Sequence, residues 1–431
     1  MTANRDRRPL AGFLGAAGIS ALGTRMSMLA LPWLVLTATG SAPLTGVVAF
    51  AEMAPYVTVQ ALGGPMVDRL GARRVSVGTD LLAAAFLGLV PVLFAARLLP
   101  PPALAGLVAV VGGARGAGDC AREVMVPGVG GIARLPLERS TGLFDGVSRA
   151  AALVGLPLAG TLVAVSSPLS VLAIDAGTFA ASAALVAALV PQAAQPPRRS
   201  RPDASTSYRS SLAEGFRFLR GDRLLLAIAA MIMITNFIDQ AGGAVLWPVW
   251  CRDVAHSPVV LGLLGGALGL GAVAGNALTT WAGPRLPRRM TYAVGFLVGG
   301  APRFLVLAGA SSVPLVLAVA GVSGVGLGGI NPVVGAAEYE RVPRHLQARV
   351  LGAVGASAWA GIPLGSLAGG VAVSAFGLRP ALLAAGVLYG VVTLAPFTFP
   401  VWCQLDRRPS PPAGDGVTTP GPAGRAAADR A

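Results

Sequence analysis

Residues 64–74 read Gly-Pro-Met-Val-Asp-Arg-Leu-Gly-Ala-Arg-Arg, a short charged segment between two long apolar runs. The flanking runs cover about residues 44–66 and 75–97, and each is close to the roughly 20 apolar residues that cross a bilayer as a helix. An arginine-rich turn between two such runs is typical of a loop that joins membrane helices. The segment therefore predicts a helical membrane protein.

Apolar runs of the same kind recur outward from this turn in both directions. We predict twelve spans from their length and from the breaks between them. The predicted spans cover residues 11–37, 44–66, 75–97, 103–125, 142–165, 168–190, 224–250, 259–283, 291–310, 313–336, 348–374 and 379–402. The predicted fold class is an all-α membrane protein with twelve transmembrane helices in two pseudo-symmetric bundles of six.

The composition agrees with this fold and excludes several classes of protein. Of 431 residues, 54% are hydrophobic and 12% are charged, against roughly 25% charged residues in soluble domains. These values exclude a disordered chain and an ordinary cytosolic domain. The formal net charge is +14, but a nucleic-acid partner is not expected from a chain of this hydropathy. All 33 basic residues are arginine, so no P-loop lysine is available for ATP.

The distribution of arginine predicts the orientation in the membrane. If the N-terminus is cytoplasmic, 25 arginines lie in cytoplasmic segments and three, Arg97, Arg252 and Arg379, lie in outside loops. Cytoplasmic loops of membrane proteins carry the excess of basic residues. We therefore expect a multi-pass protein of the inner membrane with both termini in the cytoplasm.

The two halves of the chain resemble each other in sequence. Ser41–Gly46 opens the second span and Ser257–Gly262 opens the eighth, and each span ends at a pair of arginines. Two six-helix halves in the same orientation are a signature of transporters. The expected organisation is an N-terminal tail (1–10), a first bundle (11–190), a cytoplasmic linker (191–223), a second bundle (224–402) and a disordered tail (403–431).

The linker contains a predicted amphipathic helix. Leu212, Phe216 and Leu219 fall on one helical face, and Arg217 and Arg220 fall on the other. This pattern favours a helix that lies on the inner leaflet.

No metal or cofactor site is predicted. The cysteines are Cys120, Cys251 and Cys403, with no metal-ligand spacing, and the histidines, His256 and His345, are far apart in the sequence. Widely spaced cysteines of odd number predict neither a disulfide framework nor a zinc site.

The loop at residues 64–74 resembles the G-x-x-x-D-R-x-G-R-R loop signature of the major facilitator superfamily. The resemblance implies a latch that holds the outward-open state. In it Asp68 meets the N-terminal end of span 11, where a carboxylate is favourable, and the loop arginines pair with acids at the inner end of span 4. The implied latch residues are Gly64, Asp68, Arg69, Gly71, Arg73, Arg74, Asp119 and Glu123. The second half lacks the aspartate, so we expect the stronger latch in the first half.

Further stretches resemble drug and siderophore exporters of the macrolide-efflux and enterobactin-export type. They are residues 22–36, the loop at 64–74 and residues 213–219. Residues 155–160 (Gly-Leu-Pro-Leu-Ala-Gly) are similar to the G-P-x-x-G-G antiporter signature but depart from it at Leu156 and after Gly160. The Gly/Pro residues that we expect to pack spans 5 and 11 are Gly155, Pro157, Gly160, Gly361, Pro363 and Gly365.

Charged residues inside the predicted spans are candidates for function, because a charge at the bilayer centre costs at least about 2.5 kcal/mol without a partner. The family fold implies that spans 1, 4, 7 and 10 line a central cavity. The candidate cavity residues are Arg25, Arg115, Asn236, Asp239, Gln240 and Asn331.

Structural roles compete with these functional ones. Arg25 and Glu52 could form a buried structural pair, and Asp239 could cap a helix break near Gly242. We expect Arg303 to extend to the outer interface, and Asp80 to belong to a belt of charges near the cytoplasmic face.

Proton coupling requires a carboxylate that alternates between a proton and another partner, which burial favours. Asp239 and Glu52 are the first candidates and Asp119 the third. A pair of Glu52 with Arg25 would argue against Glu52 and leave Asp239.

The expected function is export of a small amphipathic organic compound by alternating access, driven by protons, by a monomer that has no cofactor. The alternatives are a proton-coupled symporter that imports a nutrient and, more distantly, a polytopic membrane enzyme. An enzyme of that kind would need a polar constellation near one face, and the two histidines fall on opposite sides of the predicted membrane.

Overall fold

The computed structural model describes residues 7–192, 208–282, 285–343 and 346–406, and these ranges are helical without strands. Twelve helical segments within them are long and apolar enough to cross a membrane. The predicted all-α fold with twelve spans is therefore confirmed.

The first six spans are single continuous helices. They are α1 (Arg8–Thr39), α2 (Ala42–Leu62), α4 (Ala72–Ala95), α5 (Pro101–Ile132), α6 (Leu137–Val165) and α7 (Pro168–Leu189). The charged loop between the second and third spans holds the short helix α3 (Gly64–Leu70). Gly71 follows it with φ of +91°, a conformation that glycine adopts without steric cost.

The last six spans contain breaks. Their elements are α9 (Arg223–Ala241), the π-helical segment η2 (Gly242–Leu246), α10 (Trp247–Asp253), α11 (Pro258–Ala282), α12 (Arg288–Gly299), α13 (Ala301–Gly309), α14 (Val313–Gly328), α15 (Ile330–Arg341), α16 (Gln347–Trp359), α17 (Gly361–Phe376), α18 (Leu378–Thr393) and α19 (Ala395–Thr398).

Prolines explain where these spans break. Pro248 follows the π-helical segment, and Pro302, Pro332 and Pro363 follow the breaks at residues 300, 329 and 360. Proline has no backbone N–H, and its ring clashes with the carbonyl four residues earlier. The hydrogen-bond ladder is therefore interrupted one turn before each proline.

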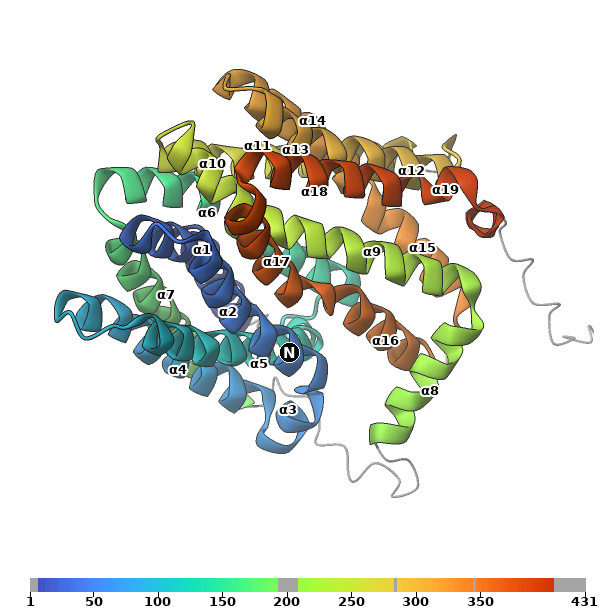
Figure 1. Cartoon of the computed structure of the whole chain (residues 1–431). Coiled ribbons are helices and arrows are strands. Elements are labelled where there is room, and N and C mark those ends of the chain that lie inside the picture. The colour runs from blue at the N-terminus through green and yellow to red at the C-terminus, as the bar shows by residue number, and fades with distance from the viewer. Residues whose placement is uncertain (1–6, 193–207, 283–284, 344–345, 407–431) are drawn as a thin grey trace, which may run out of the picture.

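The spans form two bundles of six (Figure 1). The first contains α1 to α7, and the second contains α9 to α19. Two helix pairs join the bundles, α2 with α17 and α6 with α11. The internal repeat makes α2 equivalent to α11 and α6 equivalent to α17. The two pairs are therefore equivalent to each other, and the halves meet through two related interfaces.

Glycines of the sequence repeat make both interfaces close. A Cβ placed on Gly46 of α2 would lie 2.5 Å from the carbonyl oxygen of Ser366 in α17. A Cβ placed on Gly262 of α11 would lie 2.5 Å from the carbonyl oxygen of Leu156 in α6. The equivalent glycines therefore serve the same purpose, direct backbone contact between helices of opposite halves.

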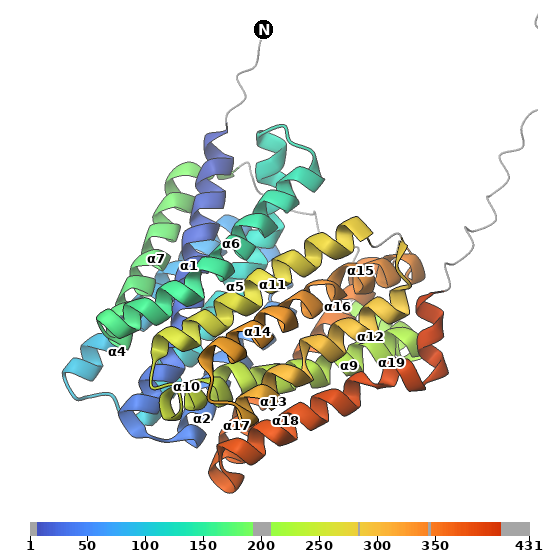
Figure 2. The same ribbon diagram turned by 90° about the horizontal axis from the view of Figure 1, so that it is seen from above.

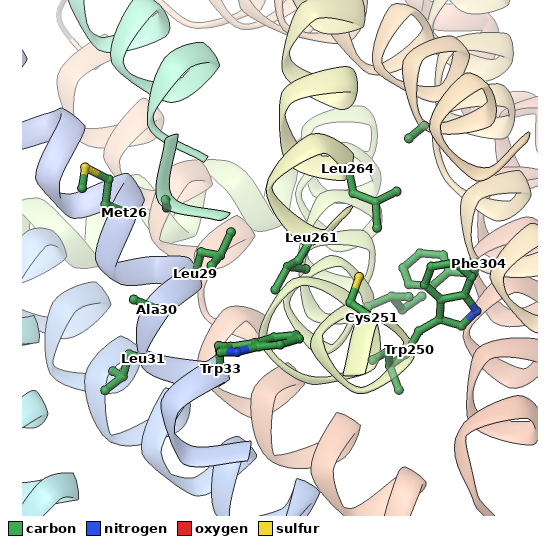
Figure 3. Packing of buried hydrophobic residues seen from close by; sticks show 14 of the residues in the cluster. Met26, Leu29, Ala30, Leu31, Trp33, Trp250, Cys251, Leu261, Leu264 and Phe304 are labelled. Atoms are coloured by element: carbon green, nitrogen blue, oxygen red, sulfur yellow. The ribbon is translucent and has the colours of Figure 1, made fainter. Parts of the chain in front are cut away.

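A buried apolar cluster extends across both halves (Figure 3). It includes Leu29 and Trp33 of α1, Trp250 of α10 and Leu261 of α11. At the same end of the molecule, Arg252 donates to the carbonyl oxygens of Leu36 (3.3 Å) and Gly40 (3.4 Å). The halves are therefore closed together at the end that carries the loops after α1 and α10.

The halves diverge toward the opposite end (Figure 2). The first bundle and the second separate in a V from the region of α2, α10 and α17. The beginning of α1 lies at the open end, which by the arginine distribution is the expected cytoplasmic side.

Helix α8 (Tyr208–Gly221) turns two residues of its predicted apolar face, Phe216 and Leu219, toward the second bundle. Phe216 and Leu219 pack in a cluster with Val350 of α16. Glu214 pairs with Arg349 of α16. Helix α8 is thus docked on the second bundle; residues 193–207 of the linker lie outside the described residues.

The predicted disordered tail begins too early. Residues Pro400–Leu405 form a 3-10 helix, Trp402 stacks on Tyr292 with ring centroids 5.3 Å apart, and Asp406 accepts from the N–H of Arg289 at 3.0 Å. Residues 407–431 lie outside the described ones.

Candidate functional site

Two adjoining pockets lie between the halves. The deeper one has a volume of about 190 Å³ and is lined by α1, α2, α6, η2, α10 and α11 together with Gln240 of α9. The second, of about 300 Å³, is lined by α1, α2, α5, α6 and Trp359 of α16, and we call it the vestibule. Arg25, Met28 and Met53 line both pockets, so these three residues form the neck between them.

The deep pocket is mainly apolar. Its polar side chains are Arg25, Glu52 and Gln240, and Trp247 adds an indole. Its apolar lining comes from Met28, Leu29, Pro32, Ala49, Met53, Leu156, Ala244 and Leu261. A concave apolar surface with a few polar groups suits a small amphipathic compound.

The vestibule is polar by comparison. Its charged lining residues are Arg25, Arg115, Asp119, Arg122, Glu123 and Asp145. Tyr56, Phe144 and Trp359 supply aromatic rings. The chemical character therefore changes from charged to apolar at the neck.

Glu52 pairs with Arg115 and not with Arg25. Arg115 Nη1 of α5 donates to Glu52 Oε1 of α2, and the two side chains are 5% and 8% exposed. The possible structural pair of Arg25 with Glu52 is therefore wrong. Glycines explain the choice, because a Cβ on Gly112 of α5 would lie 2.0 Å from the carbonyl oxygen of Glu52, so the helices approach closely there.

A second buried network is centred on Arg122, which the sequence reasoning missed. Its guanidinium donates to Asp80 (2.5 Å), Ser20 (3.0 Å) and Asp119 (3.0 Å). Asp80 also accepts from Ser182 at 2.7 Å, so this residue, which we expected in a belt of charges near the cytoplasmic face, is a buried member of the network. The signal was present in the sequence, since Arg115, Asp119 and Arg122 share one helical face.

Tyr56 connects these groups to the opposite half. Its hydroxyl donates to Asp119 at 3.2 Å, and the Arg115 guanidinium lies 5.7 Å from its ring centroid. Its ring stacks with Trp359 of α16 at 6.5 Å between centroids. Neither aromatic residue was predicted, because their meeting depends on how the two bundles are placed.

Asp239 pairs with Arg303 of α13, which is 5% exposed while Asp239 is 31% exposed. Arg303 therefore does not extend to the outer interface, and the expectation for it is wrong. Its guanidinium lies 5.6 Å from the ring centroid of Trp247, 5.1 Å from that of Phe304 and 5.6 Å from that of Tyr389. Cation–π contacts of this kind stabilise a buried guanidinium.

The other predicted cavity residues have mixed positions. Gln240 lines the deep pocket and donates to Ser366 at 3.1 Å. Asn236 donates to the carbonyl oxygen of Ala358 at 2.9 Å and lines neither pocket. Asn331 is exposed on α15 and also lines neither.

The loop residues do not form the implied latch in this structure. Asp68 is exposed and forms no ion pair with a described residue. Figure 1 shows α3, which carries Asp68, apart from α16. Asp119 pairs with Arg122, and Glu123 is exposed. The halves are open at this end, and a latch of the outward-open state would be released in such an arrangement.

An arginine–acid pair of the expected kind forms in the second half, although we expected the stronger latch in the first half. Arg288 makes a bidentate pair with Glu340, with distances of 2.6 and 2.8 Å. In the first half Arg73 instead donates to the carbonyl oxygens of Ala187 and Val190, both at 2.6 Å. Arg73 thus caps the C-terminal end of α7, which carries partial negative charge.

Replacing Arg73 by glutamine is expected to lower stability by about 1–2 kcal/mol, since two charge-assisted hydrogen bonds on a half-exposed side chain are lost. The apparent melting temperature of the purified protein should fall by several degrees. Arg74→Gln is the matched control, because Arg74 is exposed and makes no hydrogen bond to a described residue. Equal melting of the two variants would contradict the capping role.

The Gly/Pro residues of the fifth and eleventh spans lie at close helix contacts. A Cβ on Gly155 would meet Arg25 Cβ at 2.7 Å, and one on Gly160 would meet the carbonyl oxygen of Pro258 at 2.6 Å. A Cβ on Gly361 or Gly365 would lie 2.6 or 2.0 Å from carbonyl oxygens of α9. Pro157 lies against Gly266 of α11, and Pro363 is buried in α17.

The sequence matches the family model of the Major Facilitator Superfamily over residues 13–242 and 230–425. The chain belongs to the major facilitator superfamily. It is 30% identical over 413 residues to the multidrug efflux pump Tap of Mycobacterium tuberculosis, which covers 94% of this chain and 97% of Tap. It is 30% identical over 397 residues to Tap of Mycolicibacterium fortuitum, covering 91% and 96%.

Solved structures share the fold. A mutant form of the nucleoside transporter NupG superposes with a TM-score of 0.73 at 16% identity, covering 91% of this chain and 99% of that one. A bacterial homolog of the human lysosomal transporter Spinster, in an inward-facing and unoccupied conformation, gives 0.72 at 12% identity, covering 95% and 100%. Membership of the major facilitator superfamily makes the chain a multi-pass membrane transporter of a small molecule and places it outside the enzymes.

Proposed function

We propose that this transporter exports small amphipathic organic compounds by alternating access, in exchange for protons. The observation that carries the proposal is the deep apolar pocket with three polar side chains, reached through a charged vestibule. The 30% identity to Tap, a multidrug efflux pump, supports export as the direction of transport and drug-like compounds as the substrates. The arginine distribution supports an inner-membrane protein with cytoplasmic termini.

The closed end and the open end define the movement that export requires. In the outward-open state, the contacts of α2 with α17 and of α6 with α11 separate at the end that is closed in this structure. At the opposite end α3 approaches α16. Each chain contains both halves, so a monomer suffices for this cycle. Asp68 would then stabilise the N-terminal end of α16, where a carboxylate is favourable.

Asp239 is the best placed of the three candidates for proton coupling. Its side chain is partly exposed and has one charged partner, Arg303. Glu52 is enclosed with Arg115, and Asp119 is shared by Arg122 and Tyr56. A carboxylate that can change partner without disrupting a larger network is the better proton carrier.

Everted membrane vesicles test the proposal. In these vesicles export moves a substrate into the lumen. A fluorescent amphipathic dye should therefore accumulate inside them when a pH gradient drives export, and a protonophore should stop the accumulation. Vesicles without the transporter are the control. Uptake by whole cells that rises with expression of the transporter would instead identify an importer.

Asp68→Asn is expected to reduce transport by about two- to fivefold, because an uncharged side chain loses most of the roughly 0.3–1 kcal/mol that a carboxylate contributes at a helix N-terminus. The amount of protein in the membrane and its melting temperature should stay unchanged, since Asp68 is exposed in this structure. Glu138→Gln is the control, because Glu138 is an exposed acid outside the loop and lines neither pocket. Full transport by the Asp68 variant would refute the latch.

A further inference from the structure

Arg25 occupies an unusual position among the charged residues of the cavity. It lies on α1 at the neck and lines both the deep pocket and the vestibule. Its one hydrogen bond to a described residue runs from Nη1 to the sulfur of Met28 at 3.8 Å, which is a weak contact. The guanidinium thus keeps nearly all of its hydrogen-bonding capacity for the cavity.

The other arginines of the cavity are neutralised by carboxylates. Arg115 pairs with Glu52, and Arg122 pairs with Asp80 and Asp119. Arg25 forms no ion pair within the described part of the chain. A guanidinium held at a membrane interior is costly without a counter-charge, and arginine does not lose its proton in proteins. The cavity therefore carries a fixed positive charge at its neck.

Packing directs this charge into the cavity. Gly155 of α6 lies directly against the stem of Arg25, because a Cβ there would be 2.7 Å from Arg25 Cβ. The side of Arg25 that faces α6 is thus filled by backbone, and the guanidinium remains beside the neck residues Met28 and Met53.

The mouth of the vestibule has the opposite character. Glu123 and Asp145 line it, are exposed and form no ion pair with described residues. An anionic group would be repelled by these carboxylates and attracted by Arg25, so the neck is its most favourable position in the cavity. An apolar group on the same molecule would find its place in the deep pocket.

We infer that Arg25 selects amphipathic compounds that carry an anionic oxygen group, such as a carboxylate, with their apolar part in the deep pocket. The inference rests on the proposed function for its biological meaning, but the binding preference can be measured without transport. Guanidinium groups recognise carboxylates through two parallel hydrogen bonds, which a neutral amide or an amine cannot reproduce.

Binding of three naphthalene compounds to the purified full-length protein in nanodiscs tests the inference. The probes are naphthylacetic acid, its primary amide and naphthylethylamine, measured by titration calorimetry at one salt concentration. The acid should bind wild-type protein about tenfold more tightly than the amide, as a charge-assisted hydrogen bond implies. Equal binding of acid and amide, a preference for the amine, or no binding of any of the three would overturn the inference.

Arg25→Met removes the charge and keeps the length of the side chain. The variant should bind acid and amide within about twofold of each other, since the charge-assisted bond is absent, whereas Arg25→Lys should keep part of the preference. Arg149→Met is the matched control, because Arg149 is exposed on α6 and lines neither pocket. A preference for the acid that survives in the methionine variant would overturn the inference.

Two outcomes separate this inference from the proposed function. Wild-type vesicles that export the amide and the amine as well as the acid would refute the role of Arg25 and leave export standing. A clear preference for the acid in binding, together with no export of any amphipathic compound, would refute export and leave the site standing. Melting curves of all variants show whether a loss of binding reflects unfolding.

Discussion

Glu52→Gln is expected to destabilise the transporter by about 3–5 kcal/mol, the cost of breaking a buried ion pair from one side. The substitution leaves the guanidinium of Arg115 enclosed between α2 and α5 without a counter-charge. Arg25, also a cation, lines the same cavity beside Arg115. The measurement is the apparent melting temperature of the purified protein.

The reverse substitution should cost less. Arg115→Met leaves the carboxyl group of Glu52 in the membrane interior, and a carboxyl group can become neutral by taking up a proton, whereas a guanidinium cannot lose one. The order of melting temperatures is therefore wild type, then Arg115→Met, then Glu52→Gln.

The double variant provides the decisive comparison. Glu52→Gln combined with Arg115→Met removes both charges and should recover most of the stability lost in Glu52→Gln, since replacing a whole buried pair is often nearly neutral. Additive losses in the double variant would show that the two residues act separately. Glu138→Gln controls for a change of charge alone, because Glu138 is an exposed acid of α6 that forms no ion pair with a described residue.

Asp239→Asn is expected to abolish proton-driven export. Asparagine can accept hydrogen bonds from Arg303 but cannot carry a proton between the two states, so any remaining export should no longer respond to a pH gradient. The measurement is dye transport in everted vesicles with and without the gradient. Coupled export that survives the substitution would move the coupling role to Glu52.

A double variant that includes Arg303 tests whether Asp239 carries the proton or only balances the charge of Arg303. If Asp239 only neutralises Arg303, the double variant Asp239→Asn with Arg303→Met should recover coupled export. If Asp239 carries the proton, the double variant should fold yet remain uncoupled. The aromatic surroundings of Arg303 can accept the apolar methionine side chain, because Trp247, Phe304 and Tyr389 already enclose the guanidinium.

The spans and the internal repeat could be predicted because they depend on local properties. A run of about 20 apolar residues must form a helix in a bilayer, since its backbone polar groups find no other partners there. The repeat placed Gly46 and Gly262 at equivalent positions, and the structure shows both at the interfaces between halves. The number and order of the spans follow from the same local rules.

The partners of the buried charges could not be predicted from the order of spans. Glu52 had candidate partners in α1 and α5, and the glycines of α5 decided between them by allowing a closer approach. Arg303 lies on a helix expected at the periphery, but Gly242 allows the neighbouring residue Phe304 to pack against η2, which follows directly after the part of α9 that carries Asp239. Differences of a few ångströms in helix spacing select each pair, and such distances are not local properties of the sequence.

The sequence by itself determined that the chain is a twelve-span membrane protein with two related halves, a charged loop after the second span and a strong bias in arginine. These properties follow from the cost of placing polar backbone and charge in a bilayer. The tertiary structure decided which end is open, which arginines are neutralised and which one, Arg25, is left facing the cavity. These outcomes depend on how two bundles pack against each other, because close contact between glycine-bearing helices fixes the distance between side chains that lie far apart in the sequence.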